Sequence, residues 1–349
     1  MDKTGTEKAE LQDHLQVISR LHAQIDTVLG PLVDPDLAAP YALLDFPNHT
    51  NVGDSAIYAG EISWLKQKYG RLPQYVNTFT TPPSSDRIPG TGLIFIHGGG
   101  NFGDIYPKHQ AFREAVMQRY RGRRVIQLPQ SIHFGKTAGA TTTARAIAEN
   151  GKVALLVRDT ESYDFANQHF DCEVKMCPDM AFAMGPQKRR QPASRDVLLL
   201  LRQDEESINP IASKTLPAHW AVEDWLREPA DTQSRAGRQA RLQNFLSLDV
   251  KMLNRAMRLR TYYNVLADIR IERGLRQLST ARYVITDRLH AHILCTLLGI
   301  PHSFLDNSYG KIARFSAAFN TLWSGASRAD TMTEAVGFAE DYLAHTPPS

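Results

Sequence analysis

Short apolar runs alternate with segments of helical periodicity along the first half of the chain. The apolar runs predict buried strands at Tyr41–Phe46, Tyr75–Phe79, Leu93–Ile96, Val125–Leu128 and Val153–Val157, and the segments between them predict helices over 54–69, 109–121, 138–150 and 160–169. An amphipathic helix over 8–29 precedes them and is ended by Gly30 and Pro31. This βα alternation predicts a parallel sheet that is covered on both faces.

The same alternation returns after the polar, proline-containing segment Gly185–Arg195, which is the best linker candidate. The second half predicts a strand at Asp196–Leu201, a long polar and helical region to Leu278, strands at Tyr283–Ile285 and His302–Leu305, and helices over 288–298, 309–322 and 331–344. The fold class is therefore α/β, with two Rossmann-like domains facing across a cleft. We expect an N-terminal domain over 1–185, a C-terminal domain over 186–328, and a C-terminal helix and tail over 329–349.

Composition narrows the class of protein. The 349 residues include 40 Lys and Arg against 37 Asp and Glu, so the net charge of +3 does not suggest nucleic-acid binding. The start of the chain has no apolar signal segment, and no apolar run reaches the length of a membrane span. Three cysteines argue against a disulfide framework and for reduced thiols, so we expect a cytoplasmic protein.

Arginines are concentrated between Arg235 and Arg276, in segments of helical spacing. The simplest interpretation is a solvated helical face. The alternative is a patch that meets anionic lipid or a lipid-linked phosphate, which would place the protein at the periphery of the inner membrane face.

The most informative motif follows the apolar run Tyr283–Ile285. Thr286–Asp287 can cap a helix, and Arg288 and His290 then lie on its first turn, where free backbone N–H groups favour an anion. Lys311 follows the next strand, and in a parallel sheet both turns lie at the same edge. This segment predicts an anion site that contains a titratable acid. We expect His292 to be a structural helix histidine, and we expect no shared metal because residues 290 and 292 point to different sides of a helix.

Two polar loops follow strands in the first half. Asn51, Gly53 and Asp54 lie in the loop after strand 41–46, where Asp54 or Ser55 could cap the next helix and the loop could equally form a binding crevice. The second loop, 97–104, carries three consecutive glycines. Its G-x-G-x-x-G spacing does not indicate a dinucleotide site, because Pro107 should interrupt the helix that would open there. The glycines favour a close substrate, with Asn101 and Asp104 as hydroxyl-binding side chains, although a structural turn stays open.

A third strand end carries Arg158, whose planar guanidinium suits a carboxylate or a phosphate. A local ion pair with Asp159 or Glu161 fits the spacing equally well. For Pro178–Asp179, after the next short strand, we favour a purely structural role.

These motifs, in this order, resemble the polysaccharide pyruvyl transferase family, and the exopolysaccharide-biosynthesis branch most of all. The matching pieces are N-x-G-D at 51–54, GGGNFGD at 98–104, VRD at 157–159, PD at 178–179, TDRLHAHI at 286–293 and YGKI at 309–312. Together they span most of the chain.

The resemblance implies a GT-B-like fold and a metal-free, cofactor-free transfer of pyruvate from phosphoenolpyruvate onto a sugar as a cyclic ketal. It implies that His290 is the general acid, that the donor is held by Arg158, Arg288, the backbone of Leu289 and Lys311, and that the acceptor sugar faces Asn51, Asp54, Asn101 and Asp104. The acceptor would be a polysaccharide or lipid-linked oligosaccharide precursor. A carboxylate and a phosphate in one donor fit converging arginines, and an imidazolium is a suitable proton donor near neutral pH.

Two other classes stay open. A nucleotide-sugar glycosyltransferase of the same fold would use Arg288 and Lys311 on a diphosphate. A glycan-binding component of a polysaccharide assembly complex would do no chemistry, and its function would survive His290→Ala.

Overall fold

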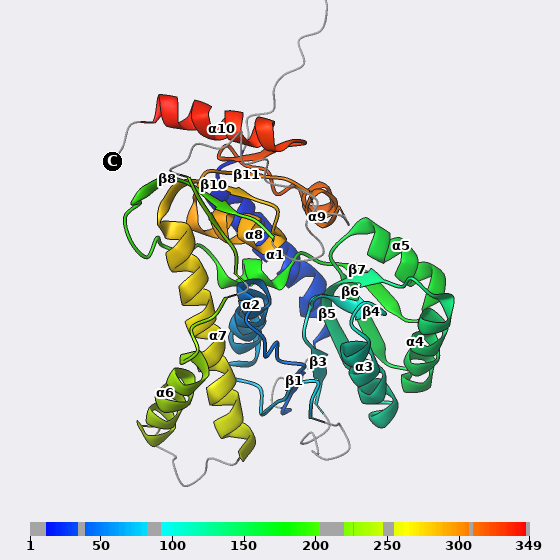
Figure 1. Cartoon of the computed structure of the whole chain (residues 1–349). Coiled ribbons are helices and arrows are strands. Elements are labelled where there is room, and N and C mark those ends of the chain that lie inside the picture. Colours follow the sequence, from blue (N-terminus) through cyan, green and yellow to red (C-terminus); the bar gives the residue numbers. More distant parts are fainter. Residues whose placement is uncertain are drawn as a thin grey trace, which may run out of the picture.

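The chain forms two parallel sheets with helices packed on their faces (Figure 1). The computed structural model describes residues 12–33, 39–81, 92–202, 220–225, 227–246, 255–306 and 310–346. The α/β class and the parallel pairing predicted from the sequence are confirmed.

The first sheet has the strand order β2-β1-β3-β5-β6-β7, and β4 pairs with the second half of β5. Its strands are β1 (Ala42–Leu44), β2 (Tyr75–Val76), β3 (Ile94–Ile96), β4 (Gly99–Gly103), β5 (Val125–His133), β6 (Val153–Val157) and β7 (Glu173–Met176). The helices of this half are α1 (His14–Leu29), η1 (Gly30–Leu32), α2 (Val52–Tyr69), α3 (Pro107–Arg119), α4 (Thr137–Asn150), α5 (Thr160–His169) and η2 (Met180–Met184).

The second sheet has five strands in the order β12-β11-β10-β8-β9. Its strands are β8 (Arg195–Leu200), β9 (Ala221–Glu223), β10 (Ala281–Thr286), β11 (His302–Phe304) and β12 (Ala326–Arg328), and its helices are α6 (Thr232–Leu246), α7 (Arg255–Ser279), α8 (Leu289–Leu298), α9 (Lys311–Phe319) and α10 (Met332–His345). Strands β10 and β11 are parallel neighbours, so their carboxyl ends, which precede Arg288 and Lys311, share one edge of the sheet as expected.

Two local expectations were wrong. Gly99–Gly103 is not a loop but strand β4, which pairs with the end of β5, and Gly99 and Gly103 both have φ near +123°, a conformation that favours glycine. Pro107 does not interrupt a helix but begins α3. Proline suits this first position, because the N–H that it lacks would have had no partner inside the helix.

A single apolar layer joins the two sheets. One continuous core cluster includes Leu43 of β1, Trp64 of α2, Leu198 of β8 and Leu294 of α8. Helices α1 and α2 lie between the sheets (Figure 1), and Arg20 of α1 donates to the carbonyl of Phe319 at the end of α9 (2.9 Å). Because this layer is shared, the carboxyl ends of strands from both sheets are held at a fixed position relative to each other.

The arginines of α7 are not simply a solvated face. Arg270 is buried and pairs with Glu228 (2.7 Å), and Arg260 donates to the carbonyl of Pro73 (2.8 Å). Arg270 also reaches the carbonyl of Pro47 (3.3 Å), and Arg273 reaches that of Thr50 (2.5 Å). These bonds fasten α7 to the loop that follows β1.

No helix in the described parts of the chain combines the length and the apolar character that crossing a membrane would need.

Candidate functional site

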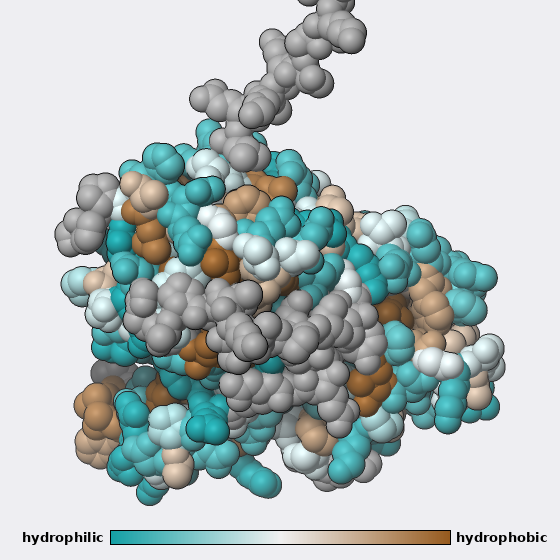
Figure 2. All heavy atoms as spheres, turned by 45° about the horizontal axis from the view of Figure 1, so that its top comes forward, coloured by the Kyte–Doolittle hydropathy of each residue, from teal (hydrophilic) through white to brown (hydrophobic). Residues whose placement is uncertain are grey.

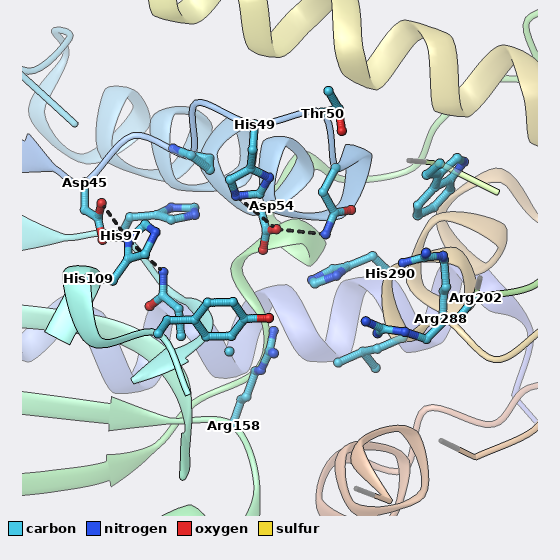
Figure 3. A pocket seen from close by; sticks show the side chains of 17 residues that line it. Asp45, His49, Thr50, Asp54, His97, His109, Arg158, Arg202, Arg288 and His290 are labelled. Carbon is cyan, nitrogen blue, oxygen red and sulfur yellow. Dashed lines mark hydrogen bonds and ion pairs between the residues drawn. The ribbon is translucent and has the colours of Figure 1, made fainter. Parts of the chain in front are cut away.

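A pocket of about 370 Å³ lies where strands of both sheets end (Figure 3). The first sheet supplies the loop after β1, the β4 region and the end of β6. The second sheet supplies the ends of β8 and β9 and the start of α8. Of the predicted site residues, the structure brings together Asn51, Asp54, Asn101, Arg158, Arg288, Leu289 and His290.

Helix α2 begins at this pocket. Its cap is Asn51, not Asp54 or Ser55 as expected: the Asn51 side chain accepts a hydrogen bond from the N–H of Gly53 (2.9 Å). The Asn51 amide also donates to Asp54 Oδ2 (2.9 Å). The cap therefore fixes the orientation of the Asp54 carboxylate, which lies within the first turn and benefits from the helix dipole.

Gly53 permits the closest approach between the two halves of the site. A Cβ atom at this position would lie 2.4 Å from Nδ1 of His290, which is too close for any real side chain. Helix α8 can therefore bring His290 against the first turn of α2 only because residue 53 is glycine. Figure 3 shows His290 pointing toward Asp54 across this contact.

His290 shares a buried carboxylate with Arg158. Nε2 of His290 lies 3.3 Å from Oδ2 of Asp179, and Arg158 Nη1 donates to the same oxygen. Asp179 is 1% exposed. Burial alone would raise its pKa, but His290, Arg158 and the N–H of Ala181 outweigh burial and hold the pKa well below its usual range. Asp179 is thus an anion at neutral pH, and the structural role favoured from the sequence understated it.

Arg158 does not form the local pair with Asp159 or Glu161 that its spacing allowed. Asp159 instead caps α5 by accepting from the N–H of Ser162 (2.8 Å). Arg158 Nε donates to Ser131 (3.1 Å), Nη1 is held by Asp179, and Nη2 lies beside Gly100, where a Cβ would come within 3.2 Å of it. The remaining edge of this guanidinium faces the pocket (Figure 3).

Arg288 occupies the N-cap position of α8, and its side chain makes no capping hydrogen bond. Thr286 and Asp287 therefore do not cap this helix. Thr286 accepts from the N–H of Arg288 (3.1 Å), and Asp287 accepts from the N–H of Arg202 (2.8 Å). The Arg288 guanidinium is buried and pairs with Asp224 through Nε (2.6 Å). With Leu289 beside it at the first position of α8, a guanidinium and a helix N-terminus open onto the same pocket wall.

Asp54 faces this cationic wall. Burial would raise its pKa, but His49, His290, His97 and Arg158 together lower the pKa below its ordinary value. Burial lowers the pKa of His49, whose Nε2 lies 3.5 Å from Asp54 Oδ2. The pocket therefore holds an ionised carboxylate on the first sheet opposite arginines carried by both sheets.

The β4 region contributes Asn101 but not Asp104. The Asn101 carbonyl oxygen accepts from Arg113 (2.8 Å) and Gln130 (3.0 Å), so its side chain is fixed at the pocket wall. Asp104 does not line the pocket. Its carboxylate accepts from the N–H groups of Gly135 (3.0 Å) and Lys136 (2.9 Å), just before α4.

Lys311 is the first residue of α9, and its side chain lies outside the described part of the structure. Its predicted contact with the donor stays a prediction. His292 is a buried structural histidine, as expected: its ring nitrogens lie 2.8 Å from His302 Nε2 and 2.8 Å from Thr321 Oγ1.

Sequence reasoning missed two histidine–carboxylate pairs on the wall of the first sheet. His109 Nδ1 lies 2.9 Å from Asp45 Oδ2, and His97 Nδ1 lies 2.8 Å from Glu61 Oε2. The carboxylates of both pairs are fully buried. Asp45 also has φ of +67°, unusual for a non-glycine residue. A polar residue at the end of an apolar run was the available signal for Asp45, but it fell inside the predicted strand.

Comparison with known proteins identifies the family. The family model of the polysaccharide pyruvyl transferases matches residues 51–309, and the chain belongs to this family. It is 35% identical over 287 residues to Pyruvyl transferase 1 of Schizosaccharomyces pombe, a match that covers 78% of this chain and 68% of the relative. It is also 31% identical over 284 residues to EpsO of Bacillus subtilis, whose name assigns it provisionally to the pyruvyl transferases, covering 80% and 84% of the two chains. The family predicted from the ordered motifs is confirmed.

A solved structure shares the fold. An uncharacterized protein of Klebsiella pneumoniae superimposes with a TM-score of 0.56 at 17% identity, covering 89% of this chain and all but 1% of that one. At this identity the likeness concerns the fold alone. Within the described residues no group of three or more histidine, cysteine or acidic side chains is arranged to hold a metal ion.

The contact at Gly53 makes a direct prediction. In Gly53→Ala, the new methyl group should push the His290 ring away from α2 and break its hydrogen bond to Asp179. A crystal structure of the variant, or the shift of the His290 ring signals in NMR, measures this. Gly30→Ala is the matched control, because a Cβ there meets nothing within 4 Å. An unmoved His290 ring in Gly53→Ala would contradict the close contact described here.

Proposed function

We propose that this pocket transfers pyruvate from phosphoenolpyruvate to two hydroxyls of one sugar, forming a cyclic ketal and releasing phosphate. The single observation that carries the proposal is the convergence of His290, Arg158 and Arg288 at the N-terminus of α8 in one pocket. A proton donor beside two guanidinium groups matches a donor that has one reacting carbon and two anionic groups.

The donor would lie against the cationic wall. Its carboxylate and phosphate would take the pocket-facing N–H groups of Arg158 and Arg288 and the N–H of Leu289, and Lys311 would reach the phosphate. Both arginines are already held by buried carboxylates, Asp179 and Asp224, so they lose little side-chain freedom when the donor binds.

Each proton in this proposed transfer has a donor and an acceptor. His290 would protonate the CH₂ carbon of phosphoenolpyruvate, giving a methyl group and an oxocarbenium-like centre at the neighbouring carbon. One sugar hydroxyl attacks that centre, the C–O bond to phosphate breaks, and the second hydroxyl closes the ring. Of the two hydroxyl protons, one returns to His290 and the other leaves with phosphate. No oxidant, reductant or metal is needed for this balance.

The acceptor would occupy the wall of the first sheet. Asn51 and Asn101 can hold sugar hydroxyls, and the Asp54 carboxylate can accept a hydrogen bond from a hydroxyl as it attacks. Asp104 lies outside the pocket, so it would act only through the loop before α4. In this arrangement residues 1–185 form an acceptor half and residues 186–328 a donor half, as in a GT-B-like enzyme, with the donor half borrowing Arg158 from the first sheet.

One assay tests the proposal. The protein is incubated with phosphoenolpyruvate and a panel of glycans that includes lipid-linked oligosaccharides, and phosphate release is followed together with the acceptor mass. We expect acceptor-dependent phosphate and a product heavier by one pyruvate ketal. Turnover of nucleotide sugars in place of phosphoenolpyruvate would favour a glycosyltransferase instead, and binding of glycan without any turnover would favour a non-catalytic role.

The roles of Arg288 and His290 should be distinguishable by their effects on KM and kcat. Arg288→Ala removes an anion-binding group, so we expect KM for phosphoenolpyruvate to rise by about tenfold or more. His290→Ala removes the proton donor, so we expect kcat to fall by roughly 10² to 10⁴. Arg282→Ala is the control: Arg282 lies on β10 but pairs with Asp196 outside the pocket (2.8 Å). If the KM and kcat effects were exchanged between the two variants, the assigned roles would be reversed.

Asp179 should act as a positioning residue for His290. Its pKa lies well below the ordinary range, so it stays ionised across the neutral range and holds Nε2 of His290 at 3.3 Å. Asp54, His49, Arg158 and Arg288 line the same pocket, and the variant leaves them in place. In Asp179→Asn the counter-charge is lost, and we expect kcat to fall by roughly ten- to a hundredfold. The His290 ring signals in NMR should also shift, because Nε2 loses its carboxylate partner.

Asp159→Asn is the matched control for this variant. Asp159 is buried next to Arg158 and caps α5, and asparagine caps equally well. The kcat and the His290 ring signals of this variant should therefore match those of the wild type. Unmoved His290 ring signals in Asp179→Asn would show that Asp179 only supports the fold.

A further inference from the structure

Helix α6 carries an exposed face of unusual composition. Three of its last five residues are large, apolar and solvent-exposed: Leu242 (58%), Phe245 (74%) and Leu246 (68%). Arg235, Arg238 and Arg241 on the same helix are also exposed. Large apolar side chains on a soluble protein surface are usually scattered, so a group of three on one helix end needs an explanation.

The geometry of α6 puts these residues on one side. The helix packs on α7 through a narrow stripe of small or short side chains, Thr232, Ala236 and Ala240, which recur every four residues. At 100° per residue, Arg238, Arg241 and Phe245 project opposite this stripe, and Leu242, Arg235 and Leu246 lie to one side of them. The outward face is therefore amphipathic along its length, with arginines toward its start and apolar side chains at its end.

The surrounding charge is mainly positive, although Asp231, just before α6, lies 4.0 Å from Arg235. The described residues of α6 and of the first half of α7, 232–246 and 255–267, contain six arginines and no aspartate or glutamate. Arg255 and Arg258 at the start of α7 are exposed like the α6 arginines. Figure 1 shows both helices extending away from the sheets on one side of the molecule. The two helices lie at the lower left of Figure 1, and hydrophobic residues lie at the surface at the lower left of Figure 2.

We propose that this face, defined by Arg235, Arg238, Arg241, Leu242, Phe245 and Leu246, binds the surface of an anionic phospholipid bilayer. Exposed apolar side chains beside an excess of arginines are complementary to a headgroup region that is negative outside and apolar just beneath. A protein partner would have to supply an acidic rim around an apolar centre, a more specific requirement. The lipid surface is the simpler occupant.

Helix α7 connects this face of α6 to the candidate site. Helix α7 packs against α6, and its Arg270 and Arg273 hold the carbonyls of Pro47 and Thr50, both of which line the pocket. A bilayer bound to α6 would therefore fix the orientation of the acceptor wall relative to the membrane. This orientation would suit a glycan acceptor carried on a lipid, a consequence that rests on the proposed function; the lipid binding itself does not.

Vesicle flotation tests the proposal directly. The full chain is mixed with vesicles of phosphatidylcholine alone, or of phosphatidylcholine with phosphatidylglycerol, at 0.1 M and 1 M salt. We expect binding to the anionic vesicles only, and weaker binding at high salt, because surface charges are screened within about 3 Å at 1 M. Equal binding to both lipids, or none to either, would overturn the proposal.

Paired variants identify the face. Arg238→Glu with Arg241→Glu should reduce partitioning by at least about thirtyfold, since each basic residue near an anionic surface contributes a factor of roughly five. The control, Arg121→Glu with Arg145→Glu, makes the same charge change on exposed residues of the first-sheet half and should lose far less. Phe245→Ser with Leu246→Ser should weaken binding at both salt concentrations, unlike Leu15→Ser on the exposed side of α1.

The outcomes separate the two proposals. Phosphate release with a soluble acceptor should be unchanged in all these variants. If the wild type released no phosphate, that result would count against the proposed function only. If Phe245→Ser with Leu246→Ser instead converted an oligomer into a monomer in sedimentation, and no variant affected flotation, a second copy of the chain would cover this face and the lipid proposal would be wrong.

Discussion

The approach of helix α8 to helix α2 is the constraint on which the candidate site depends. Each helix begins at the carboxyl end of a strand in a different sheet, and both are packed into the apolar layer that the sheets share. Gly53 lets their first turns meet, because any side chain there would occupy the space of the His290 ring. Two helix N-termini, each favourable to anions, are thus directed into one pocket. Without this contact, Asp54 and His290 would belong to separate surfaces.

Burying so many charges in one place requires that each be compensated. A buried ion pair rarely adds net stability, since removing two charges from water costs about as much as their attraction returns. Asp179, Asp224, Asp45 and Glu61 are all deeply buried and each is paired with an arginine or a histidine of the pocket. Their common effect is orientation: each carboxylate holds its partner side chain in one rotamer before any ligand arrives. This is the arrangement expected where precise placement matters more than stability.

The sequence predicted the elements that carry the site better than the contacts inside it. Strand ends and helix starts follow from apolar periodicity, and because strand ends of a parallel sheet share one edge, Asn51 and Arg158 could be assigned to one edge of the first sheet. Only the family resemblance joined them to His290 in the second sheet. Their partners could not be assigned. Asp179 lies 111 positions from His290 and follows a short strand whose end reads as a simple turn, and Asp45 reads as part of a strand. Which residue caps α2 or α8 depends on side-chain rotamers, and there the sequence-based choices of Asp54, Ser55, Thr286 and Asp287 were wrong. The arginines of α7 bind carbonyls that only the fold brings near.

The distribution of charge across the pocket has a consequence for the order of events. Arg158 and Arg288 each keep a carboxylate partner that holds the guanidinium group in place, while Asp54 stays ionised opposite. Under the proposed function, a donor with a carboxylate and a phosphate would accept from the pocket-facing N–H groups of this wall. A sugar entering first would meet an ionised carboxylate and no electrophile. The proposed chemistry therefore favours binding of the donor before the sugar, and Oδ2 of Asp179, which Arg158 and His290 share, connects a donor-binding group to the proton donor.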